Sequence, residues 1–291
     1  MQDPISVHPI DIPQRLYYNL KNKGIYGTID AISSYIGDTF YPMFIKGTDI
    51  IKQDWDILII FDAARLDLLR DFGDFDAKVN GVRSPATSSW RYMQKQYIGR
   101  ELHDTVLVSG NSYSNYLPDG IFHQIYTIIP EESQIGRIEP SLITNRALIA
   151  NKKHPNKRII VHYMQPHTPY LQFNNQDPNN PFTRARQTGD FDLLYSEYVE
   201  NYKFAEKEAH RLIDQLEGKI VITADHGEAL GERWLGIPMF GHGHWMPEVY
   251  EVPLLTVESD TRPEIFPEAP AARNHISDDL INKQLEALGY R

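Results

Sequence analysis

The sequence contains no cysteine, which excludes disulfide bonds, thiolate metal sites and thiol nucleophiles. It also has no apolar run that approaches 18 residues, so no membrane span is expected. The first residues, MQDPISVHPIDIPQRLYYNL, lack a basic segment followed by an apolar one, as a signal peptide would require. These absences predict a soluble, cytoplasmic protein.

The chain also lacks an excess of positive charge. Its net charge is −10, and this acidity argues against nucleic acid or anionic membranes as partners. With 291 residues, 41% of them hydrophobic, the chain suffices for a large globular domain. Residues 12–50, within the segment 1–50, are rich in aromatic residues and interrupted by glycine. We expect residues 1–50 to form a helical extension, with short helices around 14–22 and 29–36, ahead of a main domain at 51–291.

Short apolar runs recur along the main domain and alternate with helical patterns. Each run is rich in Ile, Val or Leu and has the length of a buried strand. The runs lie at 56–61, 105–110, 158–164, 219–224 and 252–257. The clearest helical pattern spans about 192–216 and ends before Gly218, whereas the composition of 174–190 predicts a loop. The alternation predicts an α/β fold with a large, mainly parallel sheet sandwiched between helices.

Potential metal ligands follow several of these predicted strands. Asp62 ends the first strand, His167 follows the run at 158–164, and Asp225 and His226 follow the run at 219–224. Ligands of such sheets bind beyond the carboxyl ends of the strands. Neighbouring carboxylates repel one another unless a cation or a proton lies between them. We therefore predict that Asp62, Asp225 and His226 bind a divalent metal, although an Asp in this position can also serve only as a helix cap.

Three consecutive hydroxyl residues, Thr87, Ser88 and Ser89, precede a predicted helix that carries Trp90, Met93 and Tyr97 on one face. One of the hydroxyls could simply cap this helix. Alternatively, one could be a nucleophile, because a helix N-terminus favours anions and a nearby metal favours the alkoxide. Both roles can be filled at once by different residues.

Four segments, in this order, resemble the alkaline phosphatase and sulfatase superfamily: DILIIFDAARLD, VHYMQPHTPY, VITADHGEALGE and GHGHWMPEVYEVPLL. The nearest resemblance is to archaeal sulfatase-like proteins, and it covers roughly residues 55–291. The resemblance implies an alkaline phosphatase-like core. It also implies that Asp62, Asp225 and His226 hold the metal together with the nucleophile.

The resemblance further implies that His167 contacts the substrate or assists the leaving group. His242 would bind a second metal or the transferred group, with His244 as its competitor. Thr87 is the preferred nucleophile, followed by Ser88 and then Ser89. The donor set favours Zn²⁺ or Mn²⁺, with Ca²⁺ or Mg²⁺ as the alternative; one site is expected and a second is left open.

Formylglycine sulfatases differ from this chain, because they carry Cys or Ser in a C/S-x-P-S-R motif that SPATSSWR does not match. We therefore expect an unmodified hydroxyl nucleophile. Three interpretations stay open: a metal-dependent hydrolase of phosphate or sulfate esters, a transferase of phospho-substituents to a glycan or lipid, and a non-catalytic relative. The expected substrate is a small-molecule, glycan or lipid ester. The sequence indicates no oligomeric state.

Overall fold

The computed structural model describes residues 11–130, 136–173, 181–273 and 275–288. Its main feature is a seven-stranded sheet in the order β2-β9-β6-β1-β5-β3-β4. The strands are β1 (Ile57–Asp62), β2 (Asn80–Arg83), β3 (Leu102–Ser109), β4 (Phe122–Thr127), β5 (Arg158–Pro166), β6 (Ile220–Ala224) and β9 (Glu251–Val257). A separate hairpin comprises β7 (Ala229–Trp234) and β8 (Ile237–Gly241).

The central strands run parallel, and β9 runs antiparallel to both β6 and β2. All five predicted strands are present, and the predicted α/β class with a mainly parallel sheet between helices is confirmed. The sequence did not predict β2, β4 or the β7–β8 hairpin. Strand β2 has only four residues, and β4 and β7 have polar residues in their interiors, so these three lack the apolar runs that mark the others. Strand β8 is apolar but short and contains Pro238.

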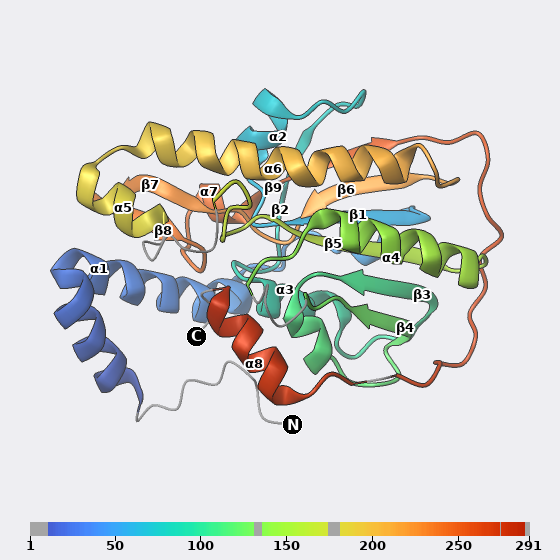
Figure 1. Cartoon of the computed structure of the whole chain (residues 1–291), viewed down its shortest axis with the longest axis horizontal. Helices are drawn as coiled ribbons and strands as arrows, with labels where there is room; N and C mark the ends of the chain where they lie inside the picture. Colours follow the sequence, from blue (N-terminus) through green and yellow to red (C-terminus); the bar gives the residue numbers. More distant parts are fainter. Residues whose placement is uncertain (1–10, 131–135, 174–180, 274, 289–291) are drawn as a thin grey trace.

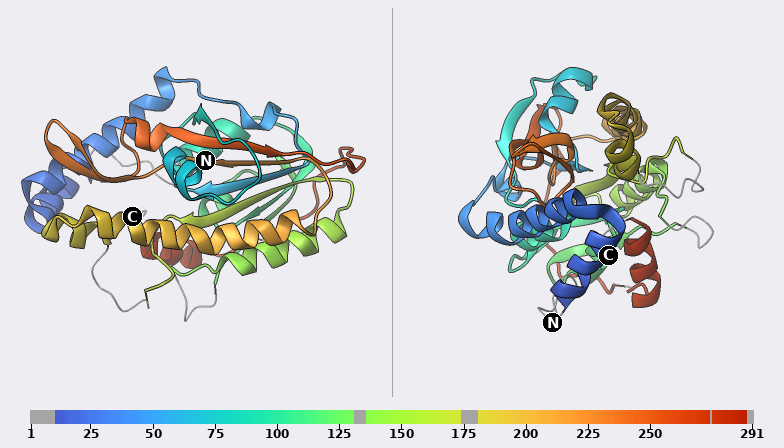
Figure 2. Two further views of the ribbon diagram at one scale, coloured as in Figure 1. Left: turned by 90° about the horizontal axis from the view of Figure 1, so that it is seen from above. Right: turned by 90° about the vertical axis from the view of Figure 1, so that its left-hand side faces the viewer.

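Helices cover both faces of the sheet (Figures 1 and 2). Strand β1 shows why, because Ile57, Ile59 and Phe61 pack into one core while Leu58 and Ile60 pack into the other. A strand buried on both faces reads as a continuous apolar run. The first core is covered by α2 (Leu66–Phe72), α4 (Pro140–Lys153) and α6 (Phe191–Ile213). The second is covered by α3 (Ser89–Tyr97), α8 (Asp278–Ala287) and the 3-10 helices η1 (Ile50–Lys52) and η2 (Ser112–Tyr116).

Helix α1 (Asp11–Phe44) lies beside the β7–β8 hairpin, at the end of the molecule where the parallel strands terminate (Figure 1). The sequence predicts two short helices here. The structure has a break at Gly24, with φ 67° and ψ −172°, that divides α1 into two longer helical parts. The division of the chain at residue 50 stays a prediction. Among the described residues, no helix has both the length and the hydropathy needed to cross a membrane.

Two short helices complete the fold, α5 (Pro181–Thr188) and α7 (Pro247–Tyr250). The sequence predicts a loop over residues 174–190, but residues 181–188 form helix α5, so this part of the prediction is wrong. Residues 174–180 lie outside the described residues. Proline at the first helical position has its backbone angle preset for a helix and lacks only an N–H that would stay unbonded there. The composition of the segment hid this start, because asparagine dominates the residues before Pro181.

Candidate metal centre and active site

The parallel register of β1 and β6 brings the two aspartates together. Phe61 pairs with Ala224, so the next residues, Asp62 and Asp225, leave the sheet side by side. Both side chains are fully buried, and so is the adjacent His226. One ligand atom from each of the three lies within 4.8 Å of the others. Two strand ends thus assemble a compact group of two carboxylates and one imidazole, which we call the first group.

Hydrogen bonds orient this first group so that lone pairs face inward. Oδ1 of Asp225 accepts from the backbone N–H groups of Ala63, at 3.1 Å, and His226, at 2.8 Å. Its Oδ2 is buried and has no hydrogen bond to the described residues. Nδ1 of His226 lies 2.9 Å from the Gly227 carbonyl oxygen, and a hydrogen donated there leaves Nε2 as an acceptor. Nε2 faces oxygens of Asp62 and Asp225 at 3.7 and 3.6 Å. Such acceptors suit a shared divalent cation.

The electrostatics of the first group point the same way. Burial, reinforced by the Asp225 carboxylate, raises the pKa of Asp62 well above its usual value. Burial would also raise the pKa of Asp225, but the neighbouring His226 and His162 imidazoles hold it well below its usual range. Burial lowers the pKa of His226 and so favours the neutral ring that can bind a metal. Two carboxylates this close do not both ionise readily without a cation.

Ser89 is the hydroxyl that lies against the first group. Its Oγ is 3.1 Å from Oδ2 of Asp62, to which it donates a hydrogen bond, and 3.2 Å from Nε2 of His226. It is the first residue of α3, and the residue before it makes no side-chain capping bond to the helix. Ser88 is therefore not used as a side-chain N-cap, and the positive end of the α3 helix dipole lies next to the first group.

The other two hydroxyls have different surroundings. Ser88 donates a hydrogen bond to Asp38 on α1. Thr87 has a buried Oγ1 without a hydrogen bond to the described residues, while its backbone carbonyl accepts from Gly243 at 2.7 Å. Placement thus favours Ser89 as the nucleophile over the two residues that the sequence favours. Which hydroxyl reacts stays a prediction.

Two polar residues complete the surroundings of the first group and escaped the sequence analysis. Asn111, just beyond β3, donates from Nδ2 to Oδ2 of Asp62 at 2.7 Å. His162, on β5, lies with Nε2 3.6 Å from Asp62 and 3.5 Å from Asp225. Asn111 follows a predicted strand, so the strand-end rule would have found it. His162 shows only as one polar residue inside an apolar run.

A second group consists of His167, Glu228 and His242, whose ligand atoms also lie within 4.8 Å of one another. The β7–β8 hairpin assembles it, because Ala229 pairs with Gly241 and the flanking Glu228 and His242 therefore meet. Nδ1 of His242 lies 3.3 Å from Oε1 of Glu228. The rings of His242 and His226 have centroids 4.7 Å apart, so the two groups are neighbours.

Burial sets the charge state of this second group. It lowers the pKa of His167 to about 4 and also lowers the pKa of His242, so both rings are neutral near pH 7. Burial raises the pKa of Glu228. Two neutral imidazoles and a carboxylate suit either a second cation or an oxyanion with shared protons.

His244 lies apart from both groups. Its Nε2 is 3.1 Å from the Phe240 carbonyl oxygen and 3.3 Å from Oδ1 of Asp30, and its Nδ1 is 3.1 Å from Ser33. Since Asp30 and Ser33 belong to α1, this histidine joins the 241–245 loop to that helix. Of the two competing histidines, His242 is therefore the one that lies beside the first group.

Comparison with known proteins identifies the family. The sulfatase family model matches residues 79–290. The chain belongs to the sulfatase family. A search of curated proteins found no match. The resemblance seen in the sequence is thus confirmed at the level of the family, and the nearer likeness to archaeal members stays a prediction.

Several solved structures are similar to this sulfatase-family chain. One is the C-terminal periplasmic domain of EptC from Escherichia coli in complex with Zn, with 15% identity, a TM-score of 0.47, and coverage of 74% of this chain and 76% of that one. Another is the lipooligosaccharide phosphoethanolamine transferase EptA from Neisseria meningitidis, an integral membrane protein. Its sequence identity is 14% and its TM-score is 0.46, and the match covers 86% of this chain and 59% of that one. A third is the phosphonate monoester hydrolase of Agrobacterium radiobacter. Its sequence identity is 14% and its TM-score is 0.45, and the match covers 69% of this chain and 67% of that one. Likeness at this level says nothing of the reaction of this chain.

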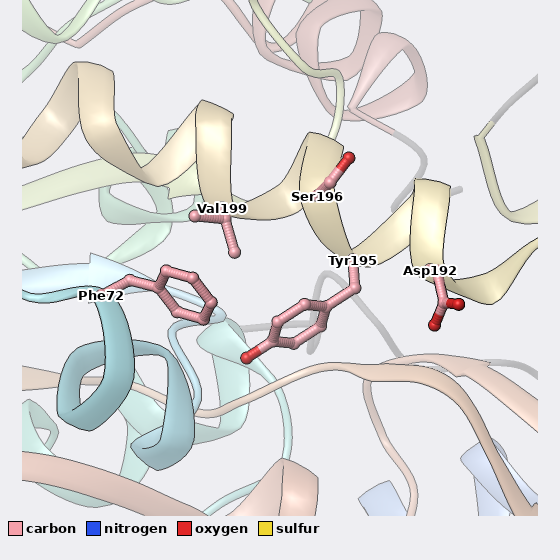
Figure 3. Close-up of a pocket in the computed structure, with 5 residues that line it drawn as sticks. All are labelled: Phe72, Asp192, Tyr195, Ser196 and Val199. Carbon is pink, nitrogen blue, oxygen red and sulfur yellow. The ribbon is translucent and has the colours of Figure 1, made fainter.

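A separate cavity of about 290 Å³ lies between α2 and α6 (Figure 3). Phe72, Asp192, Tyr195, Ser196 and Val199 line it, and none of them belongs to either group. The ring centroids of Phe72 and Tyr195 are 5.9 Å apart. With mostly apolar walls and no buried charged group aimed into it, this cavity does not compete with the first group as a site of chemistry.

Proposed function

We propose that this sulfatase-family protein is a metal-dependent hydrolase of phosphate esters, with Ser89 as an unmodified hydroxyl nucleophile. The observation that carries the proposal is the position of the Ser89 Oγ within 3.2 Å of both Asp62 and His226, at the first turn of α3. A bound divalent ion would supply Lewis acidity and favour the Ser89 alkoxide. Asp62, Asp225 and His226 would hold it, because their inward acceptors fit a cation, and Zn²⁺ or Mn²⁺ suits the mixed donor set.

The reaction divides into two displacements. In the first, Ser89 gives its hydroxyl proton to Asp62, which already accepts a hydrogen bond from it. The Ser89 Oγ then bonds to phosphorus as the bond from phosphorus to the ester oxygen breaks. The departing alkoxide takes a proton from water or from the second group. In the second, water attacks phosphorus, the bond to Ser89 breaks, and the serine regains a proton. Throughout, the positive end of the α3 helix dipole favours the negative charge on the phosphoryl oxygens.

The second group would orient the transferred phosphoryl group or the leaving oxygen. Its two neutral imidazoles can donate hydrogen bonds, and the Glu228 carboxylate, 3.3 Å from Nδ1 of His242, fixes the His242 ring. The same three residues could hold a second divalent ion. That alternative is favoured by the convergence of their ligand atoms and by the lowered pKa values of His167 and His242.

A transferase would share the first displacement and differ only in the acceptor of the second. In a hydrolase, water attacks the phosphoserine, whereas in a transferase an acceptor alcohol does. If an added alcohol such as glycerol competes effectively with water at low concentration, transfer is the better description. Sulfate esters fit the same geometry, and only comparative rates distinguish them from phosphate esters.

The test uses nitrophenyl phosphate, bis-nitrophenyl phosphate and nitrophenyl sulfate with Zn²⁺, Mn²⁺, Mg²⁺ and Ca²⁺. We expect metal-dependent turnover of a phosphate ester, and a loss of about 10³-fold or more in kcat for Ser89→Ala with metal still bound. Ser88→Ala and Thr87→Ala are matched controls that should change kcat only a few-fold. Full activity in Ser89→Ala would disprove the assigned nucleophile, and no turnover of any ester would favour a non-catalytic protein.

A further inference from the structure

The most exposed side chains of α1 between Ile25 and Phe44 are all aliphatic, aromatic or Met. All of these residues are described, and every one that is exposed is Ile, Tyr, Phe or Met. They are Ile25, Tyr26, Ile32, Tyr35, Ile36, Phe40, Met43 and Phe44. At about 100° per residue they fall within one half of the helix circumference and form a broad stripe roughly 30 Å long. The segment contains no Lys, Arg or Glu, so nothing charged interrupts this stripe.

The two acidic residues of the segment face the rest of the molecule instead. Asp30 pairs with Arg186 and lies beside His244, and Asp38 accepts from Ser88 and lies near Arg91. The opposite side of α1 is also packed closely, since a Cβ on Gly37 would lie 2.1 Å from the Gly243 carbonyl oxygen. The polar side of this helix is thus used inside the protomer, and its apolar side is left to solvent.

The size of this surface exceeds what a monomer usually exposes. Ile25, Met43 and Phe44 are 63%, 68% and 70% exposed, and Trp245, stacked on Phe44, is 46% exposed. Together with the remaining exposed side chains they present on the order of 1,000 Å². A single contiguous apolar patch on a monomer is about 300–600 Å², whereas a stable interface needs about 800 Å² from each partner.

We propose that a second copy of this chain covers the stripe, so that α1 of one protomer packs against α1 of its partner. Area and composition both fit: the cores of homodimer interfaces are rich in aromatic residues and Met and depleted of charge. In a two-fold dimer the same surface of both protomers meets, so a charged stripe would face its own charges. This stripe carries no charged residue, and no such repulsion arises. A membrane surface fits less well, because helices that lie on membranes carry Lys and Arg beside their apolar face, and residues 25–44 contain neither.

Sedimentation equilibrium of the full chain tests the proposal. We expect a mass of about twice 33.6 kDa for the wild type and 33.6 kDa for Ile32→Glu/Ile36→Glu. Leu142→Glu/Ile149→Glu, which places the same charges on exposed positions of α4, is the control and should stay dimeric. A monomeric wild type, or an Ile32→Glu/Ile36→Glu variant that stays dimeric, overturns the proposal. Co-sedimentation of a monomeric wild type with phosphatidylcholine vesicles would overturn it in favour of a lipid surface.

Cross-linking gives a second readout that does not depend on how well the charged variant folds. The chain has no cysteine, so a single introduced thiol reports without background. Ile36 lies near the middle of the stripe, and residues near a two-fold axis meet their own copies. Ile36→Cys should therefore form disulfide-linked dimers under mild oxidation, and Ile149→Cys should not. Equal cross-linking of both variants, or of neither, would contradict the proposed interface.

Discussion

The two ligand groups differ in what holds them. The first group stands on the ends of adjacent parallel strands in the centre of the sheet, and all three of its side chains are fully buried. The second group joins a loop residue, His167, to the two flanks of a hairpin outside the main sheet. A strand end in a buried sheet is set by backbone pairing on both sides, whereas a hairpin flank depends on whatever packs against it. The first group should therefore be the rigid one and the second the adjustable one.

Helix α1 is what packs against the second group. Ser34 donates a hydrogen bond to the His242 carbonyl oxygen at 2.7 Å, and Gly37 approaches Gly243 closely. This helix precedes the residues that the family model matches, 79–290. The second group is therefore positioned partly by a segment outside the matched region. If the proposed dimer forms through the other side of α1, the partner protomer would also steady the loop that carries His242.

The largest effect is expected from Asp225→Asn in the first group. This change keeps the shape but removes a negative charge from a fully buried ligand set, so metal binding should weaken by about 100-fold or more. Turnover of a phosphate ester should fall by about 10³-fold. Titration calorimetry with Zn²⁺ and elemental analysis measure the first effect. Asp104→Asn, a carboxylate on β3 outside both groups, is the control and should bind metal normally.

Equal metal content and equal affinity in Asp225→Asn and wild type would contradict the metal assignment of the first group. Since the side chain is buried, the thermal unfolding midpoint of the variant without metal should also be measured. A variant that unfolds at the same temperature as wild type but binds no metal gives the clearest support for the assignment.

An intermediate effect is expected from Glu228→Gln in the second group. The first group should keep its ion, because Glu228 is not among its ligands. Turnover should fall by about 10- to 100-fold, the loss typical when a residue that orients a ligand or substrate contact is altered. If wild type binds two ions per chain, the variant should bind one. Metal stoichiometry at saturating Zn²⁺ measures this.

Glu232→Gln is the matched control, since it lies on the same hairpin but pairs with Arg65. Loss of all metal from Glu228→Gln would show that the two groups act as a single site, and the distinction between a rigid and an adjustable group would then be wrong.

The same contrast explains how much could be predicted from the sequence. Asp62 and Asp225 follow apolar runs, and the ends of parallel strands meet at one edge, so their convergence could be foreseen. Glu228 stands in the same motif as Asp225, but its meeting with His242 depends on the β7–β8 register. That hairpin turns through Leu235 and Gly236, with φ values of 50° and 82°, and leucine gives no sequence signal for such a turn.

The choice among the three hydroxyls could not be read from the sequence either. Successive side chains at a helix start point in directions about 100° apart, so only one can face the metal ligands. Which one does so depends on where α3 begins and on contacts from distant residues. Ser88 is held by Asp38, 50 positions earlier in the chain. Nothing in SPATSSWR itself encodes that contact.

The predicted cytoplasmic location and the division of the chain at residue 50 stay predictions.

The smallest effect is expected from Ser34→Ala on α1. The change removes one hydrogen bond to the loop that carries His242 and should cost about 1 kcal/mol of unfolding free energy. Turnover should fall only a few-fold, because the backbone of the loop keeps its other contact, from Gly243 to Thr87. Metal binding by the first group should not change, since no residue of α1 belongs to it. Thr28→Ala, which removes a hydrogen bond within α1 alone, is the control for helix stability. A drop in turnover for Ser34→Ala that Thr28→Ala does not show would locate the effect in the second group. Equal, unchanged turnover in both variants would mean that α1 does not position His242, and a loss of metal from the first group would mean that the two groups are not held independently.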